Sequence, residues 1–287
     1  MPDKAMTPEA ESGAMPWLSS NLRLRLISGS VLAVVAFVLT YAGPLPFAAL
    51  VLFCTLVISW EWGGLVRDTT FDTGFFVHAT AVTIAIVLAA AGYAALSIAV
   101  LAVAAIVLIP ICFGNRARLS ALGVFYDGLP AIALLWLRTD EPLGFIAVLF
   151  IFAVVWSSDT AAYAAGSNIG GPKLWPRVSP HKTWSGLIGA LCAGAASGAV
   201  IAAIEPEAGA ARLVLIGTAL ALIAQGGDLA ESALKRLFHH KDASGLIPGH
   251  GGFMDRMDSL IAVAVAAALL ALVIDPHAPA RALLYGF

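Results

Sequence analysis

Residues 94–113 read AALSIAVLAVAAIVLIPICF, a run of twenty residues without a single charged side chain. A helix needs about 20 mostly apolar residues to cross the hydrocarbon core of a bilayer. The rest of the chain has the same character: of its 287 residues, 60% are hydrophobic and 12% are charged, and the mean hydropathy is +0.90. A soluble domain carries about 25% charged residues. We therefore predict an integral membrane protein that has the lipid bilayer as its solvent.

Apolar runs of similar length lie on both sides of this one, and breaks that contain glycine or proline separate them. The prediction is an all-α protein with about nine transmembrane helices. Their expected positions are 26–43, 45–64, 74–92, 94–113, 120–138, 144–165, 184–204, 211–234 and 256–274.

The predicted helices divide the chain into three parts. Residues 1–20 are polar and are expected to form a disordered cytoplasmic arm. Residues 21–143 hold helices one to five, whose connections are short. Residues 144–287 hold helices six to nine and two long, basic cytoplasmic loops, near 166–183 and 235–255. Functional backbone is often found in loops of this kind, so this last part is the predicted catalytic part.

The basic residues predict the orientation, because cytoplasmic loops are enriched in lysine and arginine. With a cytoplasmic N-terminus and alternating connections, Arg138, Arg212 and Arg281 face outside and thirteen basic residues face the cytoplasm. We expect a cytoplasmic N-terminus, an external C-terminus and a multi-pass protein of the cell inner (plasma) membrane with a cytoplasmic active site. The thirteen are Lys4, Arg23, Arg25, Arg67, Arg116, Arg118, Lys173, Arg177, Lys182, Lys235, Arg236, Lys241 and Arg256.

The eighth predicted helix carries a polar stripe near its cytoplasmic end. Asp228, Glu231, Ser232 and Lys235 are spaced so that they lie on one face of a helix. A carboxylate such as Asp228 is costly inside a membrane and usually has a partner or an ion. The stripe therefore indicates a functional site.

A glycine-rich turn at 248–252, PGHGG, follows this helix. Glycines allow backbone amides to approach an anion closely.

Asp255 and Asp258 come next, at the expected start of the last helix, where negative charge is favoured. Asp228 and Asp255 can converge from consecutive helices, and carboxylate oxygens suit Mg2+. Carboxylate-bound Mg2+ with basic residues nearby is the arrangement that nucleotidyl transfer requires. The basic residues here are Lys235, Arg236, Lys241 and Arg256.

The segment 228–258, DLAESALKRLFHHKDASGLIPGHGGFMDRMD, resembles the signature of phosphatidate cytidylyltransferases, which are also called CDP-diacylglycerol synthases. Nearly every specified position matches, so the resemblance is highly specific. A second segment, 173–186, KLWPRVSPHKTWSG, is similar to the Ser-Pro-Lys-Lys-Thr-x-Glu-Gly core of that family. Two departures are His181, where the family usually has lysine, and Ser185, where it usually has an acidic residue.

The resemblance implies that CTP and phosphatidic acid react to give CDP-diacylglycerol and pyrophosphate in phospholipid biosynthesis, with Mg2+ required. Asp228 and Asp255 are the expected metal ligands, and a second, monovalent cation such as K+ is left open. Asp228, Asp255, Lys235, Lys241 and Arg256 are the expected catalytic residues. The expected substrate-binding residues are Asp159, Lys173, Ser179, Lys182, Thr183, Ser232, Arg236, Asp242, His250, Gly251, Gly252 and Asp258.

The predicted partners are CTP, phosphatidic acid and membrane lipid, and the resemblance favours a homodimer. A net charge of −2 gives no indication of a nucleic-acid partner. Two alternatives remain: a cytidylyltransferase acting on another membrane lipid phosphate, and a polytopic transporter. A transporter more often shows paired interrupted helices in two halves, whereas the polar chemistry here lies at one end.

Some polar and small residues are given structural roles or none. Glu61 and Asp127 are interpreted as interfacial or structural charges, and His78 as a histidine without a partner. The stretch Gly189–Gly198 is rich in small residues, which membrane helices use at their interfaces. These residues could pack within one chain or between two.

Overall fold

The computed structural model describes residues 20–112, 116–240, 242–246 and 251–287, with side chains from residue 29 onward. The arm predicted at 1–20 lies outside these residues except for its last position. The predicted site residues Lys241 and His250 also lie outside them.

Each of the nine predicted apolar runs corresponds to a helix, which confirms the all-α membrane class. The helices are α1 (Ser20–Tyr41), α2 (Pro44–Arg67), α3 (Thr73–Ala90), α4 (Ala94–Ile111), α5 (Arg116–Arg138), α6 (Gly144–Asn168), α7 (Trp184–Ile204), α8 (Ala210–Leu237) and α9 (Asp258–Ile274).

Within the described residues, α2 to α8 are each long and apolar enough to cross a membrane. α9 and a short tenth helix, α10 (Pro279–Tyr285), together make an eighth candidate span, bent by 91°. The described apolar part of α1, Gly29–Tyr41, is shorter. The protein is therefore a multi-pass membrane protein, and nine crossings remain a prediction.

Two features were not predicted from the sequence. The first is α10, which turns back at the end of the chain. The second is an antiparallel hairpin of β1 (Lys173–Trp175) and β2 (Ser179–Thr183) in the long loop between α6 and α7. Two short 3-10 turns, η1 (Pro206–Ala208) and η2 (Met254–Arg256), complete the structure.

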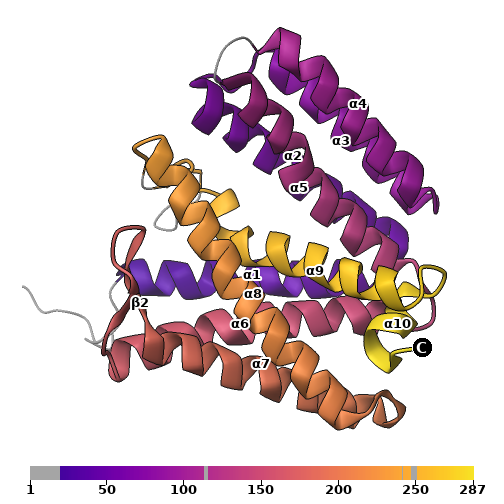
Figure 1. The fold of residues 1–287 in the computed structure, drawn as a ribbon, viewed down its shortest axis with the longest axis vertical. Coiled ribbons are helices and arrows are strands. Elements are labelled where there is room, and N and C mark those ends of the chain that lie inside the picture. Colours follow the sequence, from indigo (N-terminus) through magenta and orange to yellow (C-terminus); the bar gives the residue numbers. More distant parts are fainter. Residues whose placement is uncertain (1–19, 113–115, 241, 247–250) are drawn as a thin grey trace, which may run out of the picture.

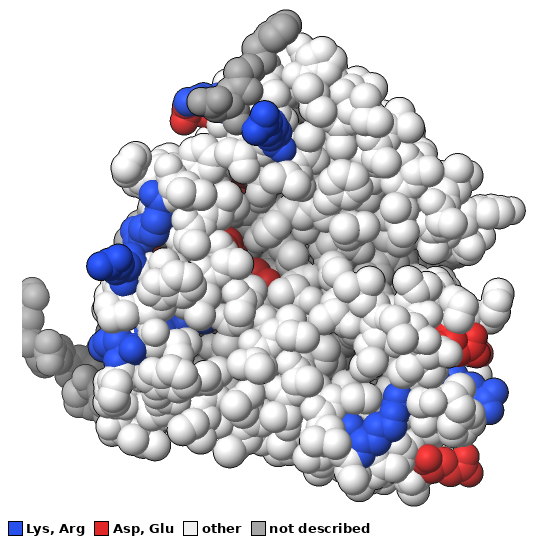
Figure 2. Space-filling model, viewed as in Figure 1, with Lys and Arg blue, Asp and Glu red and all other residues white. Residues whose placement is uncertain are grey.

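The helices form two groups that α9 connects (Figure 1). α2 to α5 form one group, α6 to α8 form the other, and α9 packs against α8 and α6 as well as α5. Lys and Arg side chains gather along the left side and at the lower right of the view in Figure 2, with a broad, mostly uncharged band between them. Because charged side chains avoid the hydrocarbon core, we expect this band to face lipid.

Three glycines of α7 pack within the chain, which is one of the two arrangements left open by the sequence. A Cβ atom built on Gly194 would lie 2.4 Å from the Gly217 carbonyl oxygen of α8, and one built on Gly217 would lie 2.2 Å from the Gly194 oxygen. A Cβ atom built on Gly198 would lie 2.1 Å from the Leu213 carbonyl oxygen. On its other side, α7 meets α6 at Gly189, whose Cβ would lie 2.9 Å from the Ala161 oxygen. The backbones of α6, α7 and α8 are therefore in close contact.

Arg212 near the start of α8 holds α10 in place. Its guanidinium donates to the carbonyl oxygens of Leu284 (2.6 Å), Ala282 (2.7 Å) and Leu283 (3.1 Å). The last carbonyls of a helix have no partner within the helix, and such groups are costly where water is scarce. Arg212 thus satisfies the exposed end of α10.

We expect Arg212→Ala to lower the free energy of unfolding by about 2 kcal/mol, because three carbonyl groups lose a charged donor. Thermal unfolding of the purified protein in detergent measures this change. Arg281→Ala is the matched control, since the Arg281 guanidinium stacks on Phe287, at 4.9 Å from the ring centre, instead of capping a helix. Equal stability of the two variants would contradict this role for Arg212.

Candidate active site

The first part of the site is a cluster of five side chains, here called the Lys182 cluster, at the contact of α6, α8, α9 and the hairpin. Lys182 Nζ lies 2.8 Å from Asp228 Oδ2 and donates to the Gln225 carbonyl (3.2 Å) and side-chain oxygen (3.3 Å). Asp159 Oδ1 accepts from Gln225 Nε2 at 3.2 Å and from Ser259 Oγ at 3.3 Å. Residues that are far apart in sequence thus surround one lysine.

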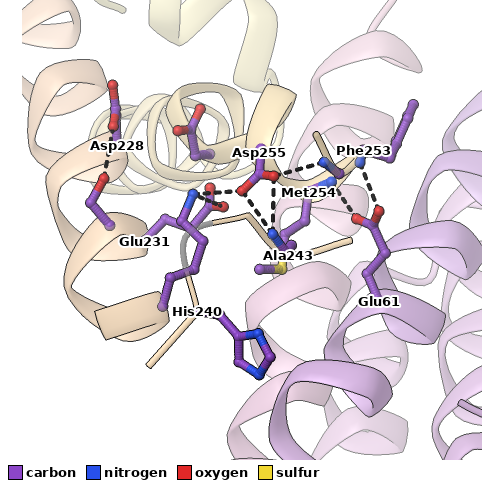
Figure 3. Close-up of polar contacts among 12 residues, drawn as sticks. Glu61, Asp228, Glu231, His240, Ala243, Phe253, Met254 and Asp255 are labelled. Atoms are coloured by element: carbon purple, nitrogen blue, oxygen red, sulfur yellow. Dashed lines mark hydrogen bonds and ion pairs between the residues drawn. The ribbon is translucent and has the colours of Figure 1, made fainter. Parts of the chain in front are cut away.

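The second part, here called the Asp255 cluster, joins the end of α8 to η2 (Figure 3). Lys235 Nζ lies 2.5 Å from Asp255 Oδ1 and 3.2 Å from Glu231 Oε1. Asp255 Oδ2 accepts from the backbone amides of Gly252 (2.7 Å) and Ala243 (3.0 Å). One carboxylate therefore binds a buried lysine and both ends of the loop that carries the glycine-rich turn.

These contacts decide the charge on Asp255. Burial raises the pKa of its carboxyl group, but hydrogen bonds with Lys235, Glu231 and the Gly252 amide lower it more, so the pKa lies below its ordinary value. Asp255 is therefore ionised at neutral pH. Its contribution to stability is present above the ordinary aspartate pKa, and it is lost as the pH falls through the lowered value.

Glu61 of α2 binds the residues that directly follow the glycine-rich turn, from the side opposite Lys235 (Figure 3). The backbone amides of Phe253 and Met254 donate to its two carboxylate oxygens, at 2.8 and 2.5 Å, and the Ser244 hydroxyl donates to Oε1. Glu61 is 1% exposed. A Cβ on Gly252 would lie 2.9 Å from Oε1, which explains a glycine at this position.

The hairpin that carries Lys182 is fixed at its base. Thr183 directly precedes α7 and is its N-cap residue, since its hydroxyl accepts from the Gly186 amide at 3.1 Å. The Ser185 hydroxyl hydrogen-bonds with Thr183 and donates to the Gly170 carbonyl. Ser185 therefore ties the two ends of the hairpin loop together.

An apolar groove of about 950 Å³ lies beside these clusters, between α1, α2, α5, α6 and the start of α9. Its lining is mostly aliphatic and aromatic, with Asp127, Asp159 and Arg256 as the charged members. Asp159 belongs to both the groove and the Lys182 cluster, so an apolar compartment and a charged one meet there.

The structure brings many of the predicted residues together and leaves others apart. Asp159, Lys182, Asp228, Lys235 and Asp255 lie in the two clusters. Ser232 Oγ donates to Asp228 Oδ1 at 3.4 Å, and the Asp258 backbone contacts α8 at Gly227. Gly251 lies between Asp242 and Asp255, and Arg256 lines the groove. Among the described contacts, none joins Lys173, Ser179 or Arg236 to the carboxylates.

One interpretation of the N-terminal part is corrected. Glu61 and Asp127, interpreted as interfacial or structural charges, are buried at 1% and 2% exposure, which fits the structural role. His78 has a partner after all: its Nε2 lies 2.9 Å from Asp127 Oδ1, while the Ser59 hydroxyl donates to Asp127 Oδ2 at 2.6 Å. A buried carboxylate requires such partners.

The donors suit a magnesium ion in kind. Among the residues that the structure describes, no three His, Cys, Asp or Glu side chains form a group that could hold a metal. However, Mg2+ in nucleotide enzymes is commonly bound by one or two carboxylates, with substrate phosphates and water as further ligands. Asp228 and Asp255 are such carboxylates, but they lie in different clusters, among the described contacts none joins them, and Lys182 and Lys235 occupy one oxygen of each. The kind of donor therefore fits an ion whose remaining ligands come from the substrate.

Comparison with known proteins covers nearly the whole chain. The model of the cytidylyltransferase family matches residues 23–274. The phosphatidate cytidylyltransferase of Brucella suis biovar 1 is 39% identical over 263 residues, which cover 91% of this chain and 97% of the relative. That of Brucella abortus biovar 1 is 40% identical over 247 residues, 85% of this chain and 91% of the relative. That of Rickettsia felis is 40% identical over 152 residues, 50% of this chain and 66% of the relative.

Proposed function

Because the chain belongs to the cytidylyltransferase family, we propose that it transfers the cytidylyl group of CTP to phosphatidate, giving CDP-diacylglycerol and pyrophosphate. It is a nucleotidyltransferase of phospholipid biosynthesis. The observation that carries this function is the meeting of the apolar groove with the Lys182 cluster at Asp159. The reaction needs such a place, since one substrate is a lipid and the other a charged nucleotide.

The chemistry follows from the charges. An oxygen of the phosphatidate phosphate forms a bond to the α-phosphorus of CTP, the bond from that phosphorus to the β-phosphate oxygen breaks, and pyrophosphate leaves with the electron pair. The nucleophile is already an anion, so no general base is required. Both reactants are negative, and Lys182, Lys235 and Arg256 supply positive charge beside the groove.

A magnesium ion held by Asp228 and Asp255 would neutralise phosphate charge and hold the reacting groups in line. On phosphate binding, Lys182 and Lys235 would exchange their present carboxylate partners for phosphate oxygens. Lys241 and the turn at Gly251 and Gly252 complete the proposed nucleotide site. This proposal needs no covalent intermediate with the protein.

The proposed setting is the cell inner (plasma) membrane, with the N-terminus and the active site facing the cytoplasm, where CTP is dissolved. The excess of basic residues on that side supports this orientation. We also propose a homodimer. Because small residues of α7 pack against α6 and α8 of the same chain, the interface between the two subunits would lie on other helix faces. Chemical cross-linking in native membranes tests this assembly.

The function is tested with purified protein in detergent, radiolabelled CTP and phosphatidate. Formation of a lipid-soluble labelled product that requires phosphatidate and Mg2+, and stops with EDTA, is the expected result. Separate reactions with K+ added or omitted show whether a monovalent cation contributes. If only another lipid phosphate, such as a polyprenyl phosphate, yields product, the enzyme class stands and the lipid substrate changes. No product with any lipid phosphate would overturn the proposed function.

A further inference from the structure

Glu61 is a buried carboxylate of the N-terminal helix group. It binds backbone amides directly after the glycine-rich turn of the C-terminal group. Its partners are 183 to 193 residues away in sequence. Both of its oxygens accept backbone amides, from Phe253 and Met254, and Ser244 adds a third donor. A buried charged acceptor with three donors is a strong and geometrically specific contact.

The two amides that Glu61 holds directly precede Asp255 and Arg256. Phe253 and Met254 are themselves buried, at 6% and 0% exposure, in an apolar cluster with Ile58 and Trp62 of α2. The apolar contacts fix the depth of the turn, and Glu61 fixes the direction of its amides. The side chain of Asp255 is held from the other side by Lys235.

We propose that Glu61 is a positioning residue of the nucleotidyl transfer: it orients the turn 252–254 so that Asp255 and Arg256 face the substrates. This inference rests on the proposed function for its catalytic meaning. Glu61 itself does not need to touch either substrate. Its effect is on kcat, because a misdirected Asp255 weakens the stabilisation of the transition state more than the binding of CTP.

The test replaces Glu61 by glutamine. The amide keeps the shape and one oxygen, but its NH2 group must face a backbone N–H that has lost its acceptor. We expect Glu61→Gln to lower kcat by about 10- to 100-fold, with KM for CTP close to that of the wild type. Ser244→Ala removes one of the three donors, so its loss should be smaller. The double variant should be no worse than Glu61→Gln alone, because the two residues share an interaction.

Asp140→Asn is the matched control. Asp140 also accepts backbone amides across the two parts of the chain, from Ala280 (2.7 Å) and Arg281 (3.3 Å), but at α10 and away from the site. We expect wild-type kcat for this variant. Its unfolding temperature shows what removing the charge of an amide-binding carboxylate costs in stability alone.

Hydrogen exchange gives a readout that does not depend on activity. The amides of Phe253 and Met254 should exchange faster in Glu61→Gln than in the wild type or in Asp140→Asn. Unchanged exchange, a wild-type kcat, or a loss of activity that merely follows the loss of folded protein would each overturn the inference. A wild-type protein that makes no product from any lipid phosphate would instead overturn the proposed function, and the exchange rates would still decide whether Glu61 fixes the turn.

Discussion

Replacing Asp255 by asparagine is expected to lower kcat for CDP-diacylglycerol formation by about 10³-fold, the cost of losing a preorganised charged group at a reacting centre. Asp255 is ionised at neutral pH because its pKa is lowered, so the variant removes a full negative charge. Lys235, which is 9% exposed, then loses its ion pair with Asp255. Among the described ion pairs, it retains only the one with Glu231. If the asparagine oxygen keeps the Gly252 and Ala243 amides, its NH2 group faces Lys235 Nζ, donor against donor.

The measurement is steady-state kinetics with phosphatidate in mixed micelles, together with thermal unfolding of the variant. Asp275→Asn is the control, because Asp275 also holds a turn amide, that of His277 at 2.8 Å, but beyond the far end of α9. A kcat within a few fold of the wild type in Asp255→Asn would remove Asp255 from the catalytic residues and from the proposed magnesium ligands.

Gly217→Ala should destabilise the fold by about 3 kcal/mol, at the upper end of the usual cost of overpacking. The added Cβ would lie 2.2 Å from the Gly194 carbonyl oxygen, so α7 and α8 must move apart. Because α8 carries Asp228 and Lys235, activity should fall together with stability.

Gly226→Ala on the same helix is the matched control, because among the described residues no atom lies within 4 Å of its added Cβ. Alanine favours a helix over glycine by about 1 kcal/mol, so helix propensity alone predicts that both substitutions stabilise. Thermal unfolding in detergent therefore tests the sign of the effect. Stabilisation by Gly217→Ala would mean that the close contact of α7 and α8 is not maintained in the protein.

The sequence predicted the helices well because membrane helices must satisfy their own backbone and cover themselves with apolar side chains. Both requirements are local and visible in a run such as 94–113. The bend into α10 was not visible, since α10 has only seven residues and depends on Arg212, a distant partner. The hairpin was likewise missed because its short strands lie in a polar loop.

Within the site, the spacing of Asp228 and Lys235 correctly placed both on one face of α8. Gln225 precedes Asp228 by three positions and lies on that same face, so its place beside Lys182 could have been inferred. Glu61 was harder to assign. A carboxylate within an apolar run is a signal of function, but the sequence does not say which of the distant loops will meet it. The choice of Asp228 and Asp255 as magnesium ligands stays a prediction.

The long separation between Glu61 and its partners also affects how the protein is made. A ribosome adds about 5 to 20 residues per second, so the 192 residues from Glu61 to Phe253 take roughly 10 to 40 s. During this time α2 has already been made, but the amides that will donate hydrogen bonds to the Glu61 carboxylate have not. A chain that stops before residue 253 keeps an unpaired carboxylate at a position that is buried in the complete protein. Chaperones and proteases of the membrane can act on this difference between incomplete and finished chains.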